Sequence, residues 1–348
     1  MNPLTGGQLE RRRRLGPVGM FLILLLGLGA TGVIAVIGLD AGRALSGGID
    51  DPTVVTAGLP TRAPAPPPDE RRALAPTVAL GAENRIPVRL DRQPRAGLLF
   101  DLEKGEALWS HKPLEVRPIA SLTKIMTALL VAERTSSRER VKITPAALKY
   151  SGSGVGVLPR GRRVPIEGLL HGMLLPSGND AAIALADHVA GSERRFVELM
   201  NRRAQELGLR CTHFSSAYGL EKADRSCAAD LAALARLAMR EPRIARVVRK
   251  RSAAVRFPIT GGKLYLNTTN PLLRLRYPGT IGLKTGYTAR AGRTYVGVVR
   301  RRGRTLGVVL LDSPDPSVQA KQIFDRAFRQ NKPRGSRGER RAAQRRSR

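Results

Sequence analysis

Hydrophobic positions at both ends of residues 91–330 follow strand-like runs. The stretch RAGLLFDLEKGEALWS, residues 95–110, has two apolar runs around an EKGE turn, which predicts a β-hairpin. Residues 292–312, GRTYVGVVRRRGRTLGVVLLD, show the same pattern around RRGR. The segment SVQAKQIFDRAF that follows, residues 317–328, has helical spacing. We therefore expect strands from both ends of this region to share one sheet.

The middle of the region, residues 119–250, shows mainly the helical period of about 3.6 residues. The predicted helical segments are 121–134, 166–175, 179–191, 193–208 and 228–242. Together these patterns predict one globular α/β (α+β) domain over residues 91–330. Its antiparallel sheet comes from both ends, and the helices form an insert between the early and late strands.

A different pattern precedes this domain. Residues 16–39 carry no charge over 24 positions, which exceeds the roughly 20 residues that a membrane-spanning helix needs. Four arginines at 11–14 predict that a basic segment, residues 1–15, stays in the cytoplasm. We favour an uncleaved anchor over a signal sequence, because the apolar run is long and residues 42–44 make a poor cleavage site. We therefore expect the protein to cross the cell membrane once, with its globular domain outside the cytoplasm. If the N-terminal segment is cleaved, the protein would instead be secreted.

Two segments lack hydrophobic periodicity. Residues 40–90 are rich in Pro and Gly, as in TRAPAPPPDERR, and predict an extended linker. Residues 331–348 form a polar, Arg-rich tail that we expect to be disordered.

Composition adds a strong positive charge. The formal net charge is +32, and 49 of the 60 basic residues are arginine. Such a surface favours anionic surroundings, for example phospholipid headgroups or acidic wall polymers. Nucleic acid is not expected as a partner, because aromatic residues make up only 4% of the chain and no aromatic-studded basic motif occurs.

Candidate chemistry begins with Ser121 and Lys124, three residues apart at the start of a predicted helix. Residues at i and i+3 share one helix face, so the hydroxyl and the amine can meet. A neutral lysine can activate a serine when burial or a nearby cation lowers its pKa. The alternative is a capping serine beside a lysine that extends to solvent.

Two further motifs are weak when taken singly. In LLPSGNDAAIALA, residues 174–186, Ser177 and Asn179 lie in a loop before a helix, where they could simply act as helix caps. In GLKTGYT, residues 282–288, Lys284, Thr285 and Gly286 lie on a strand, and this glycine would let another molecule approach the backbone. An ordinary edge strand or turn explains that segment equally well. In order along the chain, however, S-x-x-K, S-x-N and K-T-G are the combination found in penicillin-recognising serine enzymes.

On these motifs, residues 92–328 resemble the D-alanyl-D-alanine carboxypeptidases of the low-molecular-mass penicillin-binding class, peptidase family S11. Matching stretches include PIASLTKIMTALL, THFSSAYGL and NTTNPLLRLRYPGTIGLKTGYTARAG. The resemblance implies a β-lactamase/DD-peptidase-like fold and a serine-type D-Ala-D-Ala carboxypeptidase that cleaves peptidoglycan stem pentapeptides through an acyl-enzyme. It also implies that β-lactams are covalent inhibitors.

Residue roles follow from the same resemblance. Ser121 would be the nucleophile and Lys124 its base, Ser177 would relay a proton to the leaving amine, and Asn179 would hold the substrate amide. Lys284 and Thr285, with Gly286 beside them, would bind the terminal carboxylate. The backbone N–H groups of Ser121 and Tyr287 would form the oxyanion hole.

Alternatives remain at this point. A D,D-endopeptidase or a β-lactamase could use a similar constellation, and a non-catalytic wall-binding or polyanion-binding module could use the basic surface alone. We expect no cofactor and no metal, because none of the four histidines falls in the motifs and there are only two cysteines. We expect those cysteines, Cys211 and Cys227, to form a disulfide if the domain is exported; two buried thiols are the alternative.

Overall fold

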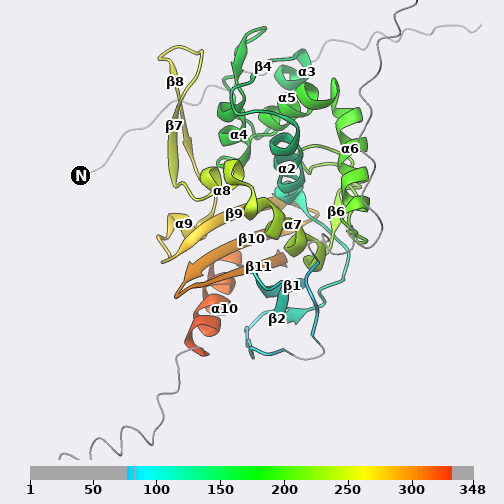
Figure 1. Ribbon diagram of the computed structural model, residues 1–348, viewed down its shortest axis with the longest axis vertical. Helices are drawn as coiled ribbons and strands as arrows, with labels where there is room; N and C mark the ends of the chain where they lie inside the picture. The colour runs from blue at the N-terminus through cyan, green and yellow to red at the C-terminus, as the bar shows by residue number, and fades with distance from the viewer. Residues whose placement is uncertain (1–76, 82–83, 331–348) are drawn as a thin grey trace, which may run out of the picture. The chain divides into compact units, whose positions relative to one another are not determined.

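Five antiparallel strands form the central sheet, in the order β2–β1–β11–β10–β9 (Figure 1). This computed structural model describes residues 77–81 and 84–330, which belong to one compact unit. The strands are β1 (Ala96–Asp101), β2 (Glu106–His111), β9 (Thr280–Thr288), β10 (Gly292–Arg301) and β11 (Arg304–Ser313). Strand β1 pairs with β11, which confirms the prediction of a sheet built from both ends of the domain.

The sheet is covered on both faces. Leu98 and Phe100 of β1 belong to a core shared with the inserted helices, whereas Leu99 belongs to a second core with α10 (Pro316–Gln330). Successive side chains of a strand point to opposite faces, so these alternate residues fill two separate cores. The uninterrupted apolar runs in the sequence reflect this double burial.

The hairpin between β10 and β11 turns at Arg302 and Gly303. Both residues have positive φ, 51° and 70° respectively. Two consecutive residues in this region match the twist of a tight hairpin, and glycine adopts the second position without steric cost. The predicted turn at RRGR is therefore confirmed.

The inserted region is mainly helical, as predicted. A short 3-10 helix η1 (Ala120–Thr123) leads into α2 (Lys124–Arg134). The helices that follow are α3 (Pro145–Lys149), α4 (Ile166–Leu174), α5 (Asn179–Ala190), α6 (Glu193–Glu206), α7 (Ala228–Arg240), α8 (Pro242–Val248) and α9 (Pro271–Arg274). Helix α7 contacts β1 and β11, while α10 covers the other face of the sheet (Figure 1).

Three small strand pairs were not predicted. They are β3 (Arg117–Pro118) with β6 (Arg225–Ser226), β4 (Arg140–Lys142) with β5 (Arg163–Pro165), and β7 (Ser252–Arg256) with β8 (Lys263–Asn267). The first two pairs have only two or three residues per strand, too few for an alternating pattern to be recognised.

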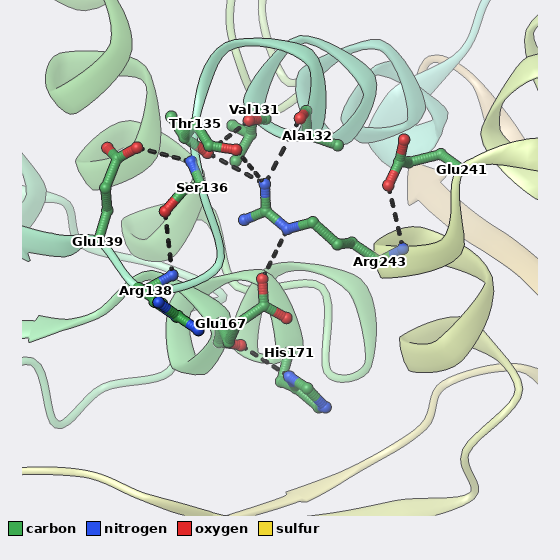
Figure 2. Close-up of polar contacts among 10 residues, drawn as sticks. All are labelled: Val131, Ala132, Thr135, Ser136, Arg138, Glu139, Glu167, His171, Glu241 and Arg243. Carbon is green, nitrogen blue, oxygen red and sulfur yellow. Dashed lines mark hydrogen bonds and ion pairs between the residues drawn. The ribbon is translucent and has the colours of Figure 1, made fainter.

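Arg243 of α8 ties together three helices of the insert (Figure 2). Its Nε lies 2.7 Å from Oε1 of Glu167 on α4, and its Nη1 donates to the carbonyl oxygen of Thr135 at 2.6 Å. Thr135 follows the last residue of α2, where carbonyl groups lack partners within the helix. The guanidinium therefore caps α2 while it pairs with a carboxylate of a neighbouring helix.

The folded unit begins earlier than the predicted boundary at residue 91. Val78 and Ile86 are buried, and the Ala79 backbone exchanges hydrogen bonds with Gly105 and Ala107 at 2.8 and 2.9 Å. These residues fall in the segment assigned to the linker, so its C-terminal part packs on the domain. The predicted basic N-terminus, membrane span and C-terminal tail lie outside the described residues. Within the described residues, no helix is long and apolar enough to cross a bilayer.

Cys211 and Cys227 are joined by a disulfide with a Cα–Cα distance of 5.5 Å. Cys227 directly precedes α7, and the bridge closes the loop between α6 and α7.

Candidate active site

Ser121 lies in η1, the short turn that precedes α2, and it is buried. The preceding residue, Ala120, has a φ of 50°, a conformation that non-glycine residues seldom adopt. Such backbone strain persists where surrounding contacts enforce it and is frequent at functional sites. The turn sets the serine at the junction between the inserted helices and β9.

Lys124, one turn further on, contacts three oxygen atoms. Its Nζ lies 2.9 Å from Oγ of Ser121, 2.5 Å from Oδ1 of Asn179 and 2.8 Å from the carbonyl oxygen of Tyr218. The carbonyl and amide oxygens can only accept, so they take two N–H groups of the amine. When the amine is neutral, its lone pair is left for the hydroxyl proton of Ser121.

The surroundings of Lys124 favour that neutral form. The side chain is completely buried, and burial holds its pKa well below the usual range for lysine. The charge of Lys284 lowers the pKa of Lys124 further, whereas Asp224 and Asp180 partly oppose the shift. A buried lysine of lowered pKa beside a serine hydroxyl has the properties of a general base.

The loop between α4 and α5 brings a second serine to the site. Ser177 has a φ of 70°, while Gly178 and Asn179 are held by backbone hydrogen bonds to Gly172 and Ser153 at 2.9 and 3.0 Å. Asn179 begins α5 and is buried, and its Nδ2 donates to the Tyr150 hydroxyl at 2.6 Å. With Oδ1 on Lys124 and Nδ2 on Tyr150, the Asn179 amide is fixed in one orientation.

Lys284 reaches the same loop from β9. Its Nζ donates to Oγ of Ser177 at 2.9 Å and to the carbonyl oxygen of Thr285 at 2.8 Å. Burial lowers the pKa of Lys284 to about 7. The neighbouring hydroxyl of Thr285 pairs with that of Thr269 at 2.7 Å.

At Gly286 the structure shows a close approach that the sequence did not suggest. A Cβ atom at this position would lie 2.5 Å from Oγ1 of Thr294 and 2.9 Å from the backbone nitrogen of Ser121. It is the protein's own turn, carrying Ser121, that approaches the strand closely. The absence of a side chain thus places the Ser121 amide next to the strand residue that precedes Tyr287.

In the described sheet, β9 pairs with β10 on one side only. The other edge leaves backbone N–H and C=O groups that an extended ligand can bind. A cleft of about 440 Å³ adjoins this strand, and the strand residues that line it are Thr285, Gly286 and Tyr287. The Tyr287 side chain is largely exposed.

The structure therefore assembles the sequence-predicted site residues into two linked groups. Ser121, Lys124 and Asn179 share direct hydrogen bonds, and Ser177 and Lys284 share another. Thr285, Gly286 and Tyr287 lie beside them on β9.

Sequence reasoning missed the carbonyl of Tyr218, the hydroxyl of Tyr150 and the hydroxyl of Thr269. Tyr218 contributes a backbone atom, which no side-chain pattern can reveal, although its stretch THFSSAYGL was among those that carried the resemblance. The glycine at position 219 indicates where this loop lies. Its φ is 91°, and a Cβ there would overlap the carbonyl of Ala120. That loop must therefore lie against the η1 turn.

Within residues 77–81 and 84–330, one group of side chains has a spacing that could suit a metal ion, namely Cys211, Cys227 and Asp230. The two sulfur atoms are bonded to each other, and Asp230 accepts hydrogen bonds from the Cys211 backbone and the Thr212 hydroxyl. These atoms are committed to structural bonds.

A buried serine–lysine pair, completed by a serine–asparagine loop and a lysine on an edge strand, defines the class of serine hydrolases with a lysine base. The profile of peptidase family S11, described as D-alanyl-D-alanine carboxypeptidase, matches residues 85–315. The chain belongs to this family and is a serine peptidase.

Known relatives agree with this assignment. The chain is 35% identical to the D-alanyl-D-alanine carboxypeptidase DacB2 of Mycobacterium tuberculosis, over 69% of this chain and 84% of the relative. It is 30% identical to DacF of Bacillus subtilis, with 74% and 67% covered. The crystal structure of the Streptomyces K15 DD-transpeptidase aligns with a TM-score of 0.65 at 29% identity, covering 70% of this chain and 99% of that one. The expected DD-peptidase fold is confirmed.

Proposed function

We propose that this protein is a D-Ala-D-Ala carboxypeptidase that removes the terminal D-alanine of peptidoglycan stem pentapeptides. The observation that carries the proposal is the contact of 2.9 Å between Nζ of a buried Lys124 and Oγ of Ser121. The names of its family relatives supply the D-alanyl-D-alanine end of the substrate, and the stem pentapeptide is the expectation that followed from the family resemblance.

In the proposed acylation step, neutral Lys124 takes the hydroxyl proton of Ser121 as Oγ attacks the carbonyl carbon of the penultimate D-alanine. The developing oxyanion would accept hydrogen bonds from the backbone N–H groups of Ser121 and Tyr287. The C–N bond breaks as the amine receives, through Ser177, the proton that Lys124 had taken, which leaves Lys124 neutral again. Water then hydrolyses the ester, with Lys124 acting again as the base.

Lys284, the second lysine of the site, is placed to bind the terminal carboxylate of the substrate. A carboxylate placed between Lys284 and Thr285 would meet a cation and a hydroxyl on β9. Lys284 also contacts Ser177, so binding of the carboxylate and proton delivery to the leaving amine would depend on one side chain. Substrate charge would in turn favour the protonated form of Lys284.

A D,D-endopeptidase and a β-lactamase share this chemistry and remain alternatives. The hydrogen bonds of Ser121 and Lys124 in the described region involve no carboxylate. That arrangement favours a peptidase over an enzyme that deacylates rapidly through a glutamate.

The membrane location is also part of the proposal. The uncharged residues 16–39, after a basic segment, support an N-terminal anchor or signal with the domain outside the cytoplasm. The Cys211–Cys227 disulfide supports an oxidising compartment.

The test is incubation of the purified protein with a stem pentapeptide that ends in D-Ala-D-Ala, followed by mass analysis of the products. Release of one D-alanine with a tetrapeptide is expected. An intact pentapeptide would contradict the proposal, while cleavage of cross-linked dimers without release from pentapeptides would identify an endopeptidase.

A further inference from the structure

The cleft beside β9 extends beyond the residues that the proposed reaction uses. Its other lining residues come from α9 and the segment just before it, from β10, and from the first residues of α10 with the residue that precedes them. They are Thr269, Pro271, Arg293, Thr294, Asp315, Pro316 and Ser317. None of these residues has a role in the acylation or proton transfer described above.

The cleft lies beside the place assigned to the leaving group, the C-terminal residue of the substrate. Thr285, assigned above to the carboxylate of the departing residue, lines the cleft together with Tyr287. In the β9–β10 ladder, Tyr287 is opposite Arg293 and Thr285 is opposite Tyr295. Residues opposite each other share a sheet face, so Thr285, Tyr287 and Arg293 all lie on the face that α9 and α10 cover. A side chain on the departing residue would therefore be next to this cleft.

The cleft is too large for alanine alone. Its volume of about 440 Å³ falls within the roughly 300–1,000 Å³ typical of small-ligand sites. A single water molecule occupies about 30 Å³ in the liquid, so one methyl group would leave most of the space to solvent.

Of the two charged side chains that line the cleft, Asp315 and Arg293, only Arg293 has most of its hydrogen-bonding groups available for a ligand. Asp315 accepts hydrogen bonds from the backbone nitrogens of Ser317 and Val318 at 2.9 and 3.1 Å, and so caps α10. Arg293 is exposed, and one of its five donors is used on the carbonyl of Pro314 at 2.9 Å. Among the residues that the structure describes, no carboxylate forms an ion pair with Arg293.

We infer that this cleft is a subsite for departing residues longer than alanine, and that Arg293 selects those with an anionic side chain. The substrate class is a peptide ending in D-Ala-D-Xaa, where Xaa carries a side-chain carboxylate. This inference rests on the proposed function, because the leaving residue defines the location of the subsite.

The experiment compares acylated L-Lys-D-Ala-D-Xaa tripeptides in which Xaa is alanine, glutamate or lysine. For the unaltered protein we expect kcat/KM for D-Glu to exceed that for D-Lys by about tenfold, since a cation attracts one side chain and repels the other. Arg293→Glu should reverse this preference. Ser317→Trp, in the first turn of α10, should reduce cleavage of both longer residues relative to D-Ala.

The matched control is Arg300→Glu, the same charge reversal at the exposed far end of β10. It should retain the preference for D-Glu over D-Lys. Equal rates for the two peptides in the unaltered protein, or the same reversal in Arg300→Glu, would overturn the inference.

Binding of the same peptides to Ser121→Ala, measured by calorimetry, separates the two proposals. Tighter binding of the D-Glu peptide in this background supports the cleft assignment even if no peptide is hydrolysed. Absence of hydrolysis of the D-Ala peptide by the unaltered protein would contradict the proposed function alone, whereas equal binding of the D-Glu and D-Lys peptides would contradict the cleft alone.

Discussion

Nζ of Lys284 lies 2.9 Å from Oγ of Ser177, although 107 residues separate the two in sequence. The contact joins the late strand β9 to the loop between two inserted helices, and so closes the site across the junction of sheet and helices. It also connects the charge of Lys284 with the proposed proton relay.

This contact leads to a prediction about pH. Burial lowers the pKa of Lys284 to about 7, so the free enzyme loses this cation as the pH rises through that value. The carboxylate of the substrate needs the charged form, and kcat/KM for a D-Ala-D-Ala peptide should therefore fall on the alkaline side. Lys284→Arg cannot lose its charge there, so its alkaline limb should disappear even if overall activity is lower. An unchanged alkaline limb in this variant would show that another group titrates.

Lys124→Arg tests the base. The guanidinium stays protonated near neutral pH, so it cannot accept the Ser121 proton. We expect acylation by a β-lactam to slow by at least about 100-fold, the lower range for loss of general-base catalysis. Mass analysis of rapidly quenched samples gives the rate of acylation. A rate within threefold of the unaltered protein would mean that Lys124 is not the base.

The Arg243 cap predicts a loss of stability (Figure 2). Arg243→Ala would leave the Glu167 carboxylate without its partner and the Thr135 carbonyl without its donor. Removing one member of a buried pair costs about 3–5 kcal/mol, and Glu167 is partly exposed, so we expect about 2–3 kcal/mol in urea unfolding. The control is Arg246→Ala, an exposed position on the same helix, which should change stability by less than about 0.5 kcal/mol. Equal effects of the two variants would refute the capping role.

We assign a structural role to the Cys211–Cys227 disulfide. Replacing Cys211 and Cys227 together by serine opens a loop with a sequence separation of 16, worth roughly 3 kcal/mol on a chain-entropy estimate. Neither residue contacts the Ser121–Lys124 pair, so the folded double variant should acylate normally. Denaturant unfolding and adduct formation measure the two effects. Normal stability, or failure of the folded variant to acylate, would contradict this role.

Local relationships were the most predictable from the sequence. Ser121 and Lys124 are three residues apart, and any helical turn brings such residues together. The two long hairpins were also predictable, because strands buried on both faces are continuously apolar. The Lys284–Ser177 contact was not predicted: the resemblance gave each residue a separate role, and spacing alone cannot bring residues so far apart into contact.

Other features of the structure could not be predicted from residue spacing or hydrophobic periodicity. Lys124 binds the carbonyl of Tyr218, and every residue has a carbonyl. Residues 77–90 lie among prolines and charges, so the burial of Val78 and Ile86 could not be read from periodicity. The close approach of the Ser121 backbone to Gly286 was not predicted, and the expected approach of another molecule to this glycine stays a prediction.

Intact-mass analysis after incubation with a β-lactam tests directly whether Ser121 is the nucleophile, because the strained amide and carboxylate of the β-lactam resemble the D-Ala-D-Ala end. We expect one covalent adduct per molecule, located by peptide mapping on Ser121 and absent in Ser121→Ala. Ser177→Ala provides the matched control, because it keeps the nucleophile and should still form an adduct on Ser121, though more slowly. An adduct that persists in Ser121→Ala, or that maps to another residue, would contradict the assignment of Ser121 as the nucleophile.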